Sequence, residues 1–178
     1  MAETITTLIS EEEIDRRIQE LADQISKDYE GKELTVVGIL KGACLFMCEL
    51  VKRISCPVYI DFMQAASYGS ATESSGTVNI KKDLDDSIED KHVIIVEDIV
   101  DSGRTLEFLG RFLRSKGAAS IRYCTLLDKP ERRVVDLEVD YTGFEIPDKF
   151  VVGYGLDYAQ KYRNLPYIGV VEELDPEG

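Results

Sequence analysis

Apolar residues along the first 130 positions occur either at helical spacing or in short continuous runs. Ser10 and Glu13 have the spacing of a helix-capping box, and the residues after them predict one apolar helix face that ends before Gly31. The apolar positions of that face are Ile14, Ile18, Leu21 and Ile25. Residues 34–40, LTVVGIL, are continuously apolar and predict a buried strand, and residues 43–53 predict a second helix.

Strands and helices continue to alternate beyond the second helix. We expect further strands at residues 57–63, 77–84, 92–98 and 120–128, and a helix at residues 105–115. This order is typical of an α/β fold built on a mostly parallel sheet. After residue 130 the pattern loosens, and short strands are expected around residues 137–144, 150–155 and 167–171. No repeat or linker divides the chain, so its 178 residues predict a single domain, residues 1–178.

Residues 64–77, QAASYGSATESSGT, differ in composition from the rest of the chain. Eleven of the fourteen are Ala, Ser, Gly or Thr, and Tyr68 is the one large apolar side chain. Such a segment buries too little apolar surface to offset the entropy of ordering it, so we expect an unstructured loop. A long loop in a compact domain is typical of a lid or binding loop, with an inert insertion as the alternative.

The charge balance bears on the partners of the chain, which has 34 acidic and 21 basic residues and a formal net charge of −13. Nucleic-acid binding requires a basic face, so we expect no nucleic-acid partner. No run of about 18 apolar residues occurs, and the first ten residues lack the layout of a secretory signal. We therefore expect no membrane association and a cytoplasmic location.

The stretch VIIVEDIVDSGRTL, residues 93–106, carries the strongest chemical signal in the sequence. An apolar strand ends in the carboxylates of Glu97 and Asp98, and a turn with small hydroxyl side chains, residues 102–105, leads into the predicted helix. Ligands of open α/β sheets bind at such carboxyl ends of strands. The N–H groups of that turn, at the positive end of the helix, suit a phosphate, and Gly103 lets the backbone come close.

The carboxylates require a different partner from the phosphate. Because neighbouring strand residues point to opposite faces, we expect Glu97 and Asp98 to be poorly placed for one tight chelate and to suit hydroxyl groups or a hydrated magnesium ion. A ribose phosphate, with a phosphate and a nearby cis-diol, fits both halves of the motif. Asp101 would then face the group attached to the sugar, where a carboxylate can accept a proton. For the carboxylate pair alone, a solvated strand end is the plain alternative.

These residues resemble the phosphoribosyl pyrophosphate motif of the type I phosphoribosyltransferases. Four more stretches resemble the hypoxanthine-guanine branch of that family. They are Leu40-Lys41-Gly42, Ser67-Tyr68-Gly69, Leu127-Asp128-Lys129-Pro130 and PDKFVVGYGLDYAQKYRNLPYIGVV at residues 147–171. The resemblance covers nearly the whole chain and implies the type I phosphoribosyltransferase fold, a mostly parallel twisted sheet flanked by helices, with a small hood and a flexible catalytic loop.

The resemblance also implies a reaction of purine salvage. The phosphoribosyl group of phosphoribosyl pyrophosphate would pass to hypoxanthine, and to guanine, giving IMP or GMP and pyrophosphate, with Mg²⁺ as cofactor. Asp101 would be the proton acceptor from the purine. Lys129 would select oxopurines by donating where adenine also donates. A homodimer or homotetramer is implied by the family alone.

Three groups of residues would bind the substrates if the resemblance holds. The phosphoribosyl group would lie on Glu97, Asp98, Ile99, Val100, Asp101, Ser102, Gly103, Arg104 and Thr105. Pyrophosphate would be bound by Lys41, Gly42 and Arg163, and the purine by Lys129, Phe150, Val151 and Asp157. Magnesium would lie near Glu97, Asp98 and Asp157. Ser67 and Tyr68 would belong to the flexible loop that closes over the leaving group.

Other interpretations stay open at this point. By composition alone, Phe150 is typical of a core residue and Arg163 of a surface charge. A regulatory protein that binds phosphoribosyl pyrophosphate without catalysis is the first alternative, although the chain has no helix-turn-helix domain or obvious basic stripe. A receiver-like signalling domain is the second, but it leaves the SGRT turn unexplained. Uracil or xanthine as the acceptor is a narrower alternative, and the order of hypoxanthine and guanine stays open.

Overall fold

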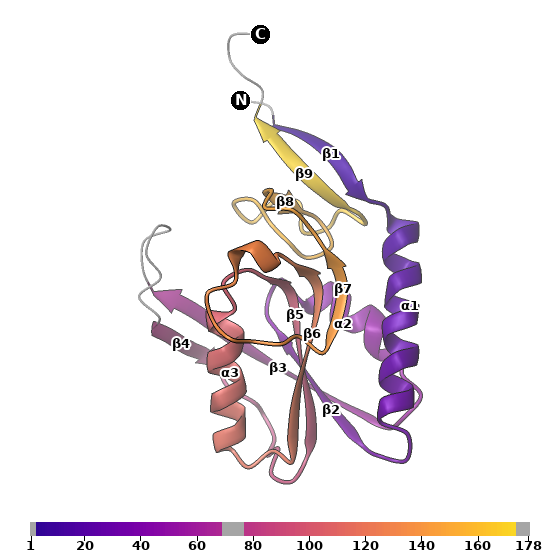
Figure 1. Ribbon diagram of the computed structural model, residues 1–178, viewed down its shortest axis with the longest axis vertical. Coiled ribbons are helices and arrows are strands. Elements are labelled where there is room, and N and C mark those ends of the chain that lie inside the picture. The colour runs from indigo at the N-terminus through magenta and orange to yellow at the C-terminus, as the bar shows by residue number, and fades with distance from the viewer. Residues whose placement is uncertain (1–2, 69–76, 174–178) are drawn as a thin grey trace.

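The computed structural model describes residues 3–68 and 77–173, in which strands and helices alternate (Figure 1). The elements are β1 (Glu3–Ile9), α1 (Glu11–Asp28), β2 (Leu34–Ile39), α2 (Cys44–Val51), β3 (Val58–Tyr68), β4 (Thr77–Lys82), β5 (His92–Val100), α3 (Arg104–Ser115), β6 (Ser120–Asp128), the short 3₁₀ helix η1 (Pro130–Arg132), β7 (Tyr141–Glu145), β8 (Val151–Val152) and β9 (Ile168–Glu173). Each predicted helix and strand is present within a few residues of its expected bounds.

The main sheet has six strands in the order β4-β3-β2-β5-β6-β7. β2 pairs in parallel with β3 and β5, β6 pairs in parallel with β5 and β7, and β4 alone runs antiparallel. Every residue of β2 is buried, as expected for a central strand covered on both faces. The predicted α/β fold with a mostly parallel sheet is therefore confirmed.

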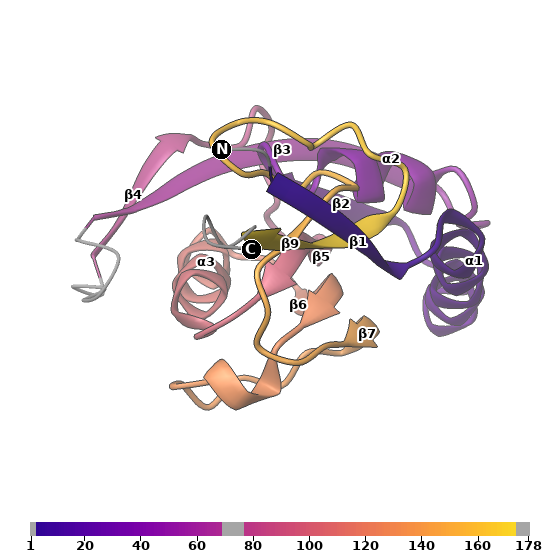
Figure 2. The same cartoon turned by 90° about the horizontal axis from the view of Figure 1, so that it is seen from above.

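Helices cover both faces of this sheet (Figure 2). On one face, α1 and α2 pack on alternate strand residues, among them Val36, Ile94 and Leu126. On the other face, α3 packs on the intervening residues, among them Val37 and Ile95. Because the strands lie between two apolar layers, their carboxyl ends are held firmly where the candidate site lies.

The start of α1 follows the predicted capping box. Glu13 N–H donates to Ser10 Oγ at 3.2 Å, and Ser10 N–H donates to Glu13 Oε2 at 2.8 Å. The predicted apolar face of this helix is buried, with Ile14 and Ile18 fully inaccessible to solvent. Local spacing in the sequence was sufficient to place this helix and its buried face.

A second, antiparallel sheet has the order β1-β9-β8 and forms the hood of the molecule (Figure 1). β1 is not among the predicted elements, which begin with the helix that follows Ser10. Its residues alternate in burial, and it pairs with β9 from Glu3 opposite Glu173 to Ile9 opposite Ile168. The partner of β1 lies about 160 to 170 positions away in the sequence. The only local indication of this strand is therefore the weak alternation of its residues.

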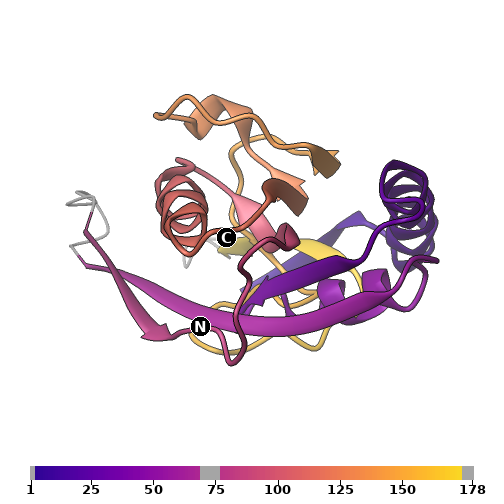
Figure 3. The same cartoon turned by 90° about the horizontal axis from the view of Figure 1, so that it is seen from below.

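The prediction of an unstructured loop over residues 64–77 is wrong at both ends. Residues 64–68 extend β3 and Thr77 begins β4, and the two strands pair antiparallel from Gln64 to Tyr68. Small side chains do not prevent pairing, because the ladder is formed by backbone N–H and C=O groups. Figure 3 shows the two strands as a hairpin that extends to one side of the molecule. Residues 69–76, the rest of the predicted loop, lie outside the described residues.

Within the described ranges, 3–68 and 77–173, no helix is long and apolar enough to cross a membrane.

Candidate functional site

The site is built around the turn between β5 and α3. Gly103 adopts a left-handed φ of 84° immediately before the helix, a conformation that favours glycine. Arg104 N–H donates to Ser102 Oγ at 3.3 Å, which fixes the turn. A cavity of about 230 Å³ lies over it, lined by Glu97, Ile99, Val100, Asp101, Ser102, Gly103, Thr105 and Leu106. Seven of the nine residues predicted to hold the phosphoribosyl group line this cavity; Asp98 and Arg104 lie beside it.

Glu97 and Asp98 form a carboxyl pair at the end of β5. Burial, and then repulsion from Asp98, raise the pKa of Glu97 well above its ordinary range. Burial also raises the pKa of Asp98, although hydrogen bonding to Ile99 N–H and the charge of Arg163 oppose that rise. The charges of the two carboxyl groups act on each other, and that they are poorly placed for one tight chelate stays a prediction. Asp98 Oδ1 accepts a hydrogen bond from the backbone N–H of the next residue, Ile99, at 2.8 Å.

The turn between β2 and α2 lies directly against this pair. A methyl group added to Gly42 would come within 1.9 Å of Asp98 Oδ2, so no larger residue fits there without a shift. The Leu40–Lys41 peptide bond is cis. Lys41 is exposed, and its ammonium lies 3.4 Å from Gln160 Oε1. One predicted pyrophosphate residue, Gly42, thus lies against the carboxyl pair, and the side chain of its neighbour Lys41 reaches Gln160.

Arg163 and Asp157 bring a third segment to the same place. Arg163 donates to Gly155 O at 2.7 Å, and its guanidinium lies 3.4 Å from Asp157 Oδ1. Its charge reaches Asp98, where it helps to hold the carboxyl ionised. The Nε atom of Arg163 is buried and has no hydrogen-bond acceptor among the residues that the structure describes. The interpretation of Arg163 as an ordinary surface charge is therefore wrong.

Lys129 follows β6 and lies on the other side of the β5 turn. Its backbone N–H donates to Val100 O at 3.0 Å, and its side chain is only 10% exposed. The ammonium lies 3.8 Å from Asp101 Oδ1 and 3.5 Å from Asp148 Oδ1. A buried cation therefore stands beside the carboxylate that was predicted to accept a proton.

Phe150 and Val151 border the same region from the hood side. Phe150 is 52% exposed, which is unusual for a large apolar side chain, so its interpretation as a core residue is wrong. Its ring contacts that of Tyr158 edge to face, with the centroids 5.6 Å apart. Val151 is buried in β8. A half-exposed aromatic ring held by a second ring is suited to stacking on a planar ligand.

Two polar residues of this site, Asp148 and Gln160, were not predicted from the sequence as site residues. Both lie inside the stretch 147–171, so the resemblance marked their neighbourhood. Only the structure reveals that they reach Lys129 and Lys41. The side chains of Ser67 and Tyr68 lie outside the described part of the structure, which gives the backbone of both residues in β3. No group of three or more His, Cys, Asp or Glu among the described residues could hold a metal ion.

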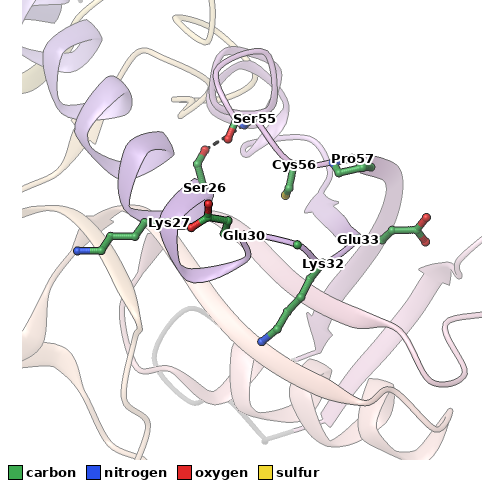
Figure 4. Close-up of a pocket in the computed structure, with 9 residues that line it drawn as sticks. Ser26, Lys27, Glu30, Lys32, Glu33, Ser55, Cys56 and Pro57 are labelled. Atoms are coloured by element: carbon green, nitrogen blue, oxygen red, sulfur yellow. Dashed lines mark hydrogen bonds between the residues drawn. The ribbon is translucent and has the colours of Figure 1, made fainter.

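A larger cavity of about 590 Å³ lies at the opposite end of the sheet (Figure 4). Its lining includes Glu33, just before β2, and Pro57, just before β3, so it borders the amino ends of the strands. Figure 4 shows Lys27, Lys32 and Glu33 pointing in different directions, and no set of like charges converges on it. Ligands of open α/β sheets bind at the carboxyl ends, so the smaller cavity is the candidate site.

Comparisons with known proteins show which family the chain resembles. A sequence-family model described as the phosphoribosyl transferase domain matches residues 6–159. The hypoxanthine-guanine phosphoribosyltransferase of Bacillus subtilis (strain 168) is 52% identical over 165 residues, which are 93% of this chain and 92% of that protein. The bifunctional protein TilS/HprT of Listeria monocytogenes (strain F2365) is 52% identical over 165 residues, but this chain spans only 26% of its length.

Solved structures give the same result. A crystal structure of a hypoxanthine-guanine phosphoribosyltransferase from Bacillus anthracis has a TM-score of 0.92 and 51% sequence identity, covering 95% of this chain and 100% of that one. The fold and the site define a protein of the phosphoribosyl transferase class. The chain belongs to the phosphoribosyl transferase domain family and, within it, to the hypoxanthine-guanine phosphoribosyltransferases.

Proposed function

We propose that this chain transfers the phosphoribosyl group of phosphoribosyl pyrophosphate to hypoxanthine, and to guanine, giving IMP or GMP and pyrophosphate. The observation that carries the proposal is the convergence of three features at one end of the sheet: a turn suited to an anion, a partly buried carboxyl pair and a lysine beside a half-exposed carboxylate. In a ribose phosphate joined to a purine, the phosphate would meet the turn, the ribose would meet the carboxyl pair, and the purine would meet the lysine and its neighbouring carboxylate. The relatives named for this activity support the same conclusion.

The turn before α3 would hold the 5′-phosphate. The N–H groups of this turn lie at the positive end of the helix, and Ser102 and Thr105 line the cavity. The pyrophosphate would lie on the Gly42 side of the carboxyl pair, where Lys41 and Arg163 supply positive charge. The buried Arg163 Nε–H, which lacks an acceptor in the described residues, is a donor suited to such an anion.

Magnesium fits the carboxyl pair. Two adjacent carboxyl groups whose pKa values are raised by burial and repulsion are stabilised by a divalent cation. Magnesium usually takes one or two carboxylates together with water and substrate phosphates, so a cage of three protein ligands is not required. Glu97 and Asp98 would contribute the oxygens, and Asp157 would do so from the other side of Arg163. When bound, the ion would neutralise the charge of the leaving pyrophosphate.

The purine would lie between Phe150 and Lys129. Phe150 would stack on the ring and Val151 would meet its edge through backbone groups. The Lys129 ammonium would donate to the exocyclic oxygen of hypoxanthine or guanine, whereas adenine presents an amino group there. The half-exposed Asp101 carboxylate would accept the proton that the purine loses as its nitrogen attacks the sugar. The loop that contains Ser67 and Tyr68 would exclude water from the sugar while it carries positive charge.

The oligomeric state and the cellular location are part of this proposal, but the geometry of the chain does not bear on either. A homodimer or homotetramer is implied by the family, and a cytoplasmic location stays a prediction. A regulatory protein that binds phosphoribosyl pyrophosphate without turning it over is the second candidate. The paired Lys129 and Asp101 favour catalysis, because a protein that only binds the sugar phosphate has no need of a proton acceptor at the base.

The test is nucleotide formation from phosphoribosyl pyrophosphate and magnesium, with hypoxanthine, guanine, xanthine, adenine and uracil offered separately. Conversion of hypoxanthine or guanine is expected, together with little or no conversion of adenine and uracil. Omission of magnesium is expected to abolish turnover. Tight binding of phosphoribosyl pyrophosphate without conversion of any base would instead support the regulatory protein.

A further inference from the structure

The Lys129 ammonium is shared between two carboxylates. It lies 3.5 Å from Asp148 Oδ1 and 3.8 Å from Asp101 Oδ1. The lysine side chain is 10% exposed, whereas the carboxylates are 45% and 49% exposed. The ammonium attracts both carboxylates, and its position sets both distances. A movement toward one carboxylate therefore weakens its attraction to the other.

Asp148 is anchored independently of Lys129. Its second oxygen, Oδ2, lies 3.4 Å from Arg132 Nη1, so the carboxylate bridges two cations. The segment that carries it is fixed by Ile146 N–H, which donates to Asp128 O at 2.9 Å. Arg132 lies on η1, whose turn is closed by Arg132 N–H donating to Lys129 O at 3.0 Å. The carboxylate therefore has a fixed place beside Lys129.

The proposed reaction requires two things of Lys129 and Asp101 that conflict. Lys129 must keep an N–H free for the purine oxygen, and Asp101 must keep a carboxylate oxygen free for the purine proton. With no other partner, a buried ammonium within 4 Å of Asp101 would close onto it and occupy both groups. Asp148 supplies the competing attraction, and from a direction that Asp101 does not occupy.

We propose that Asp148 is a positioning residue that holds the Lys129 ammonium away from Asp101, so that Lys129 recognises the oxopurine while Asp101 stays free to accept the proton. Arg132 supports this role by fixing the Asp148 carboxylate. The inference rests on the proposed function, because it concerns the purine end of that same site. It assigns to Asp148 a part in both turnover and base selection.

The alternative is that Asp148 belongs to an ordinary surface ion pair. Exposed pairs of this kind contribute little to stability, and their loss has no effect on chemistry. The two interpretations differ in what a neutral substitution changes. A surface pair would alter the melting temperature slightly and leave the kinetic constants as they are, whereas a positioning residue would alter the kinetics and the choice of base.

The experiment compares Asp148→Asn, Asp148→Glu and Arg132→Gln with the unaltered protein. For Asp148→Asn we expect kcat to fall about tenfold or more, as part of the roughly 10²- to 10⁴-fold that general acid–base assistance supplies. The KM for hypoxanthine should rise, while the KM for phosphoribosyl pyrophosphate stays within about twofold, because the anion-binding turn is untouched. Asp148→Glu should recover most of the activity, and Arg132→Gln should cause a smaller loss than Asp148→Asn.

Binding of the product nucleotides supplies a readout that a structural role would not change. Asp148→Asn should weaken the binding of IMP, which needs the Lys129 donor, and leave the binding of AMP unaffected. The dissociation constant of IMP divided by that of AMP should therefore rise. Asp136→Asn is the matched control, because Asp136 is exposed on the same connection between β6 and β7 and forms no ion pair with a described residue. That variant should match the unaltered protein in every constant.

Each outcome decides the question. If the unaltered protein converts hypoxanthine and Asp148→Asn keeps its kcat, KM and nucleotide ratio, the positioning role is wrong and the proposed function stands. The same conclusion follows if Asp148→Asn and Asp148→Glu lose activity equally, because the charge is then not what matters. If the unaltered protein converts no base, the proposed function itself fails, and the positioning role fails with it.

Discussion

The Asp101 carboxylate stands half-exposed in the turn after β5, 3.8 Å from the Lys129 ammonium. In Asp101→Asn the amide keeps the size of the side chain but cannot accept the proton of the purine. We expect kcat to fall by about 10²- to 10⁴-fold, with the dissociation constant of IMP changed less than about tenfold. Steady-state kinetics and calorimetric titration of IMP measure the two effects. Equal losses in turnover and binding would contradict a role as proton acceptor.

Gly42 is the residue at which backbone packing is tightest around the site. In Gly42→Ala the added methyl would come within 1.9 Å of Asp98 Oδ2, so either the carboxyl pair or the turn between β2 and α2 must move. We expect the KM for phosphoribosyl pyrophosphate to rise and kcat to fall. Gly31→Ala is the matched control, because its φ of 76° is strained for alanine but its methyl would meet nothing within 4 Å. That control should lose some stability and keep its activity; equal activity of both variants would show that the turn tolerates displacement.

The carboxyl end of β5 favours function over stability. Burial, and then repulsion from Asp98, raise the pKa of Glu97, so the folded protein retains a proton that the unfolded chain releases near pH 4.3, about the ordinary value for Glu. Folding stability from this group is therefore present at low pH and is lost as the pH rises through the folded pKa. Glu97→Gln does not titrate, so its melting temperature without ligand should exceed that of the unaltered protein by more at about pH 8 than at about pH 5.

The same variant should lose activity, because it removes one of the two carboxylates proposed to organise magnesium. Thermal unfolding at the two pH values and the magnesium dependence of turnover measure the two effects. Glu138→Gln, an exposed residue on the connection before β7, is the control for the loss of one negative charge. A constant difference in melting temperature across the pH range would exclude Glu97 as the titrating group.

At the level of elements, the sequence predicted what is local and apolar. α1 and the buried strands β2, β5 and β6 follow from spacing and apolar runs, because these patterns report burial directly. β1 was missed because its partner, β9, is distant in the sequence. The paired ends of β3 and β4 were missed for another reason, the loop-like composition of residues 64–68. Glu3 pairs with Glu173, and residues 64–68 of β3 are small and polar enough to look like a loop.

The candidate site divides in the same way. Residues 97–105 are continuous, so their order alone indicated a phosphate turn beside carboxylates. The contacts that complete the site join separate segments, as Gly42 does with Asp98 and Lys129 with Asp148. No spacing rule relates such segments, so only a family resemblance could bring them together in advance.

At the level of the whole molecule, the hood and the main sheet share one hydrophobic core. Ile9 and Ile168 of the hood belong to the same buried cluster as Ile14 of α1 and Val36 and Ile94 of the main sheet. The site lies between these parts, since Phe150 and Arg163 come from the hood side and Glu97 from β5. A hood that unfolded by itself would therefore remove Phe150, Val151, Asp157 and Arg163 from the predicted purine and pyrophosphate contacts.

We predict that the chain unfolds in one cooperative transition, as its single-domain sequence pattern suggests. Ile168→Ala removes a fully buried side chain in the hood and should lower the free energy of unfolding by about 2–5 kcal/mol. Because the cluster is continuous, the loss should appear equally in the helical circular dichroism of α1 to α3 and in the hydrogen exchange of β1 and β9 amides. Val134→Ala, at a side chain that is 58% exposed, should change stability by less than about 0.5 kcal/mol. Separate transitions for hood and sheet would show that the hood is an independent unit, and the site would then form only when the two are joined.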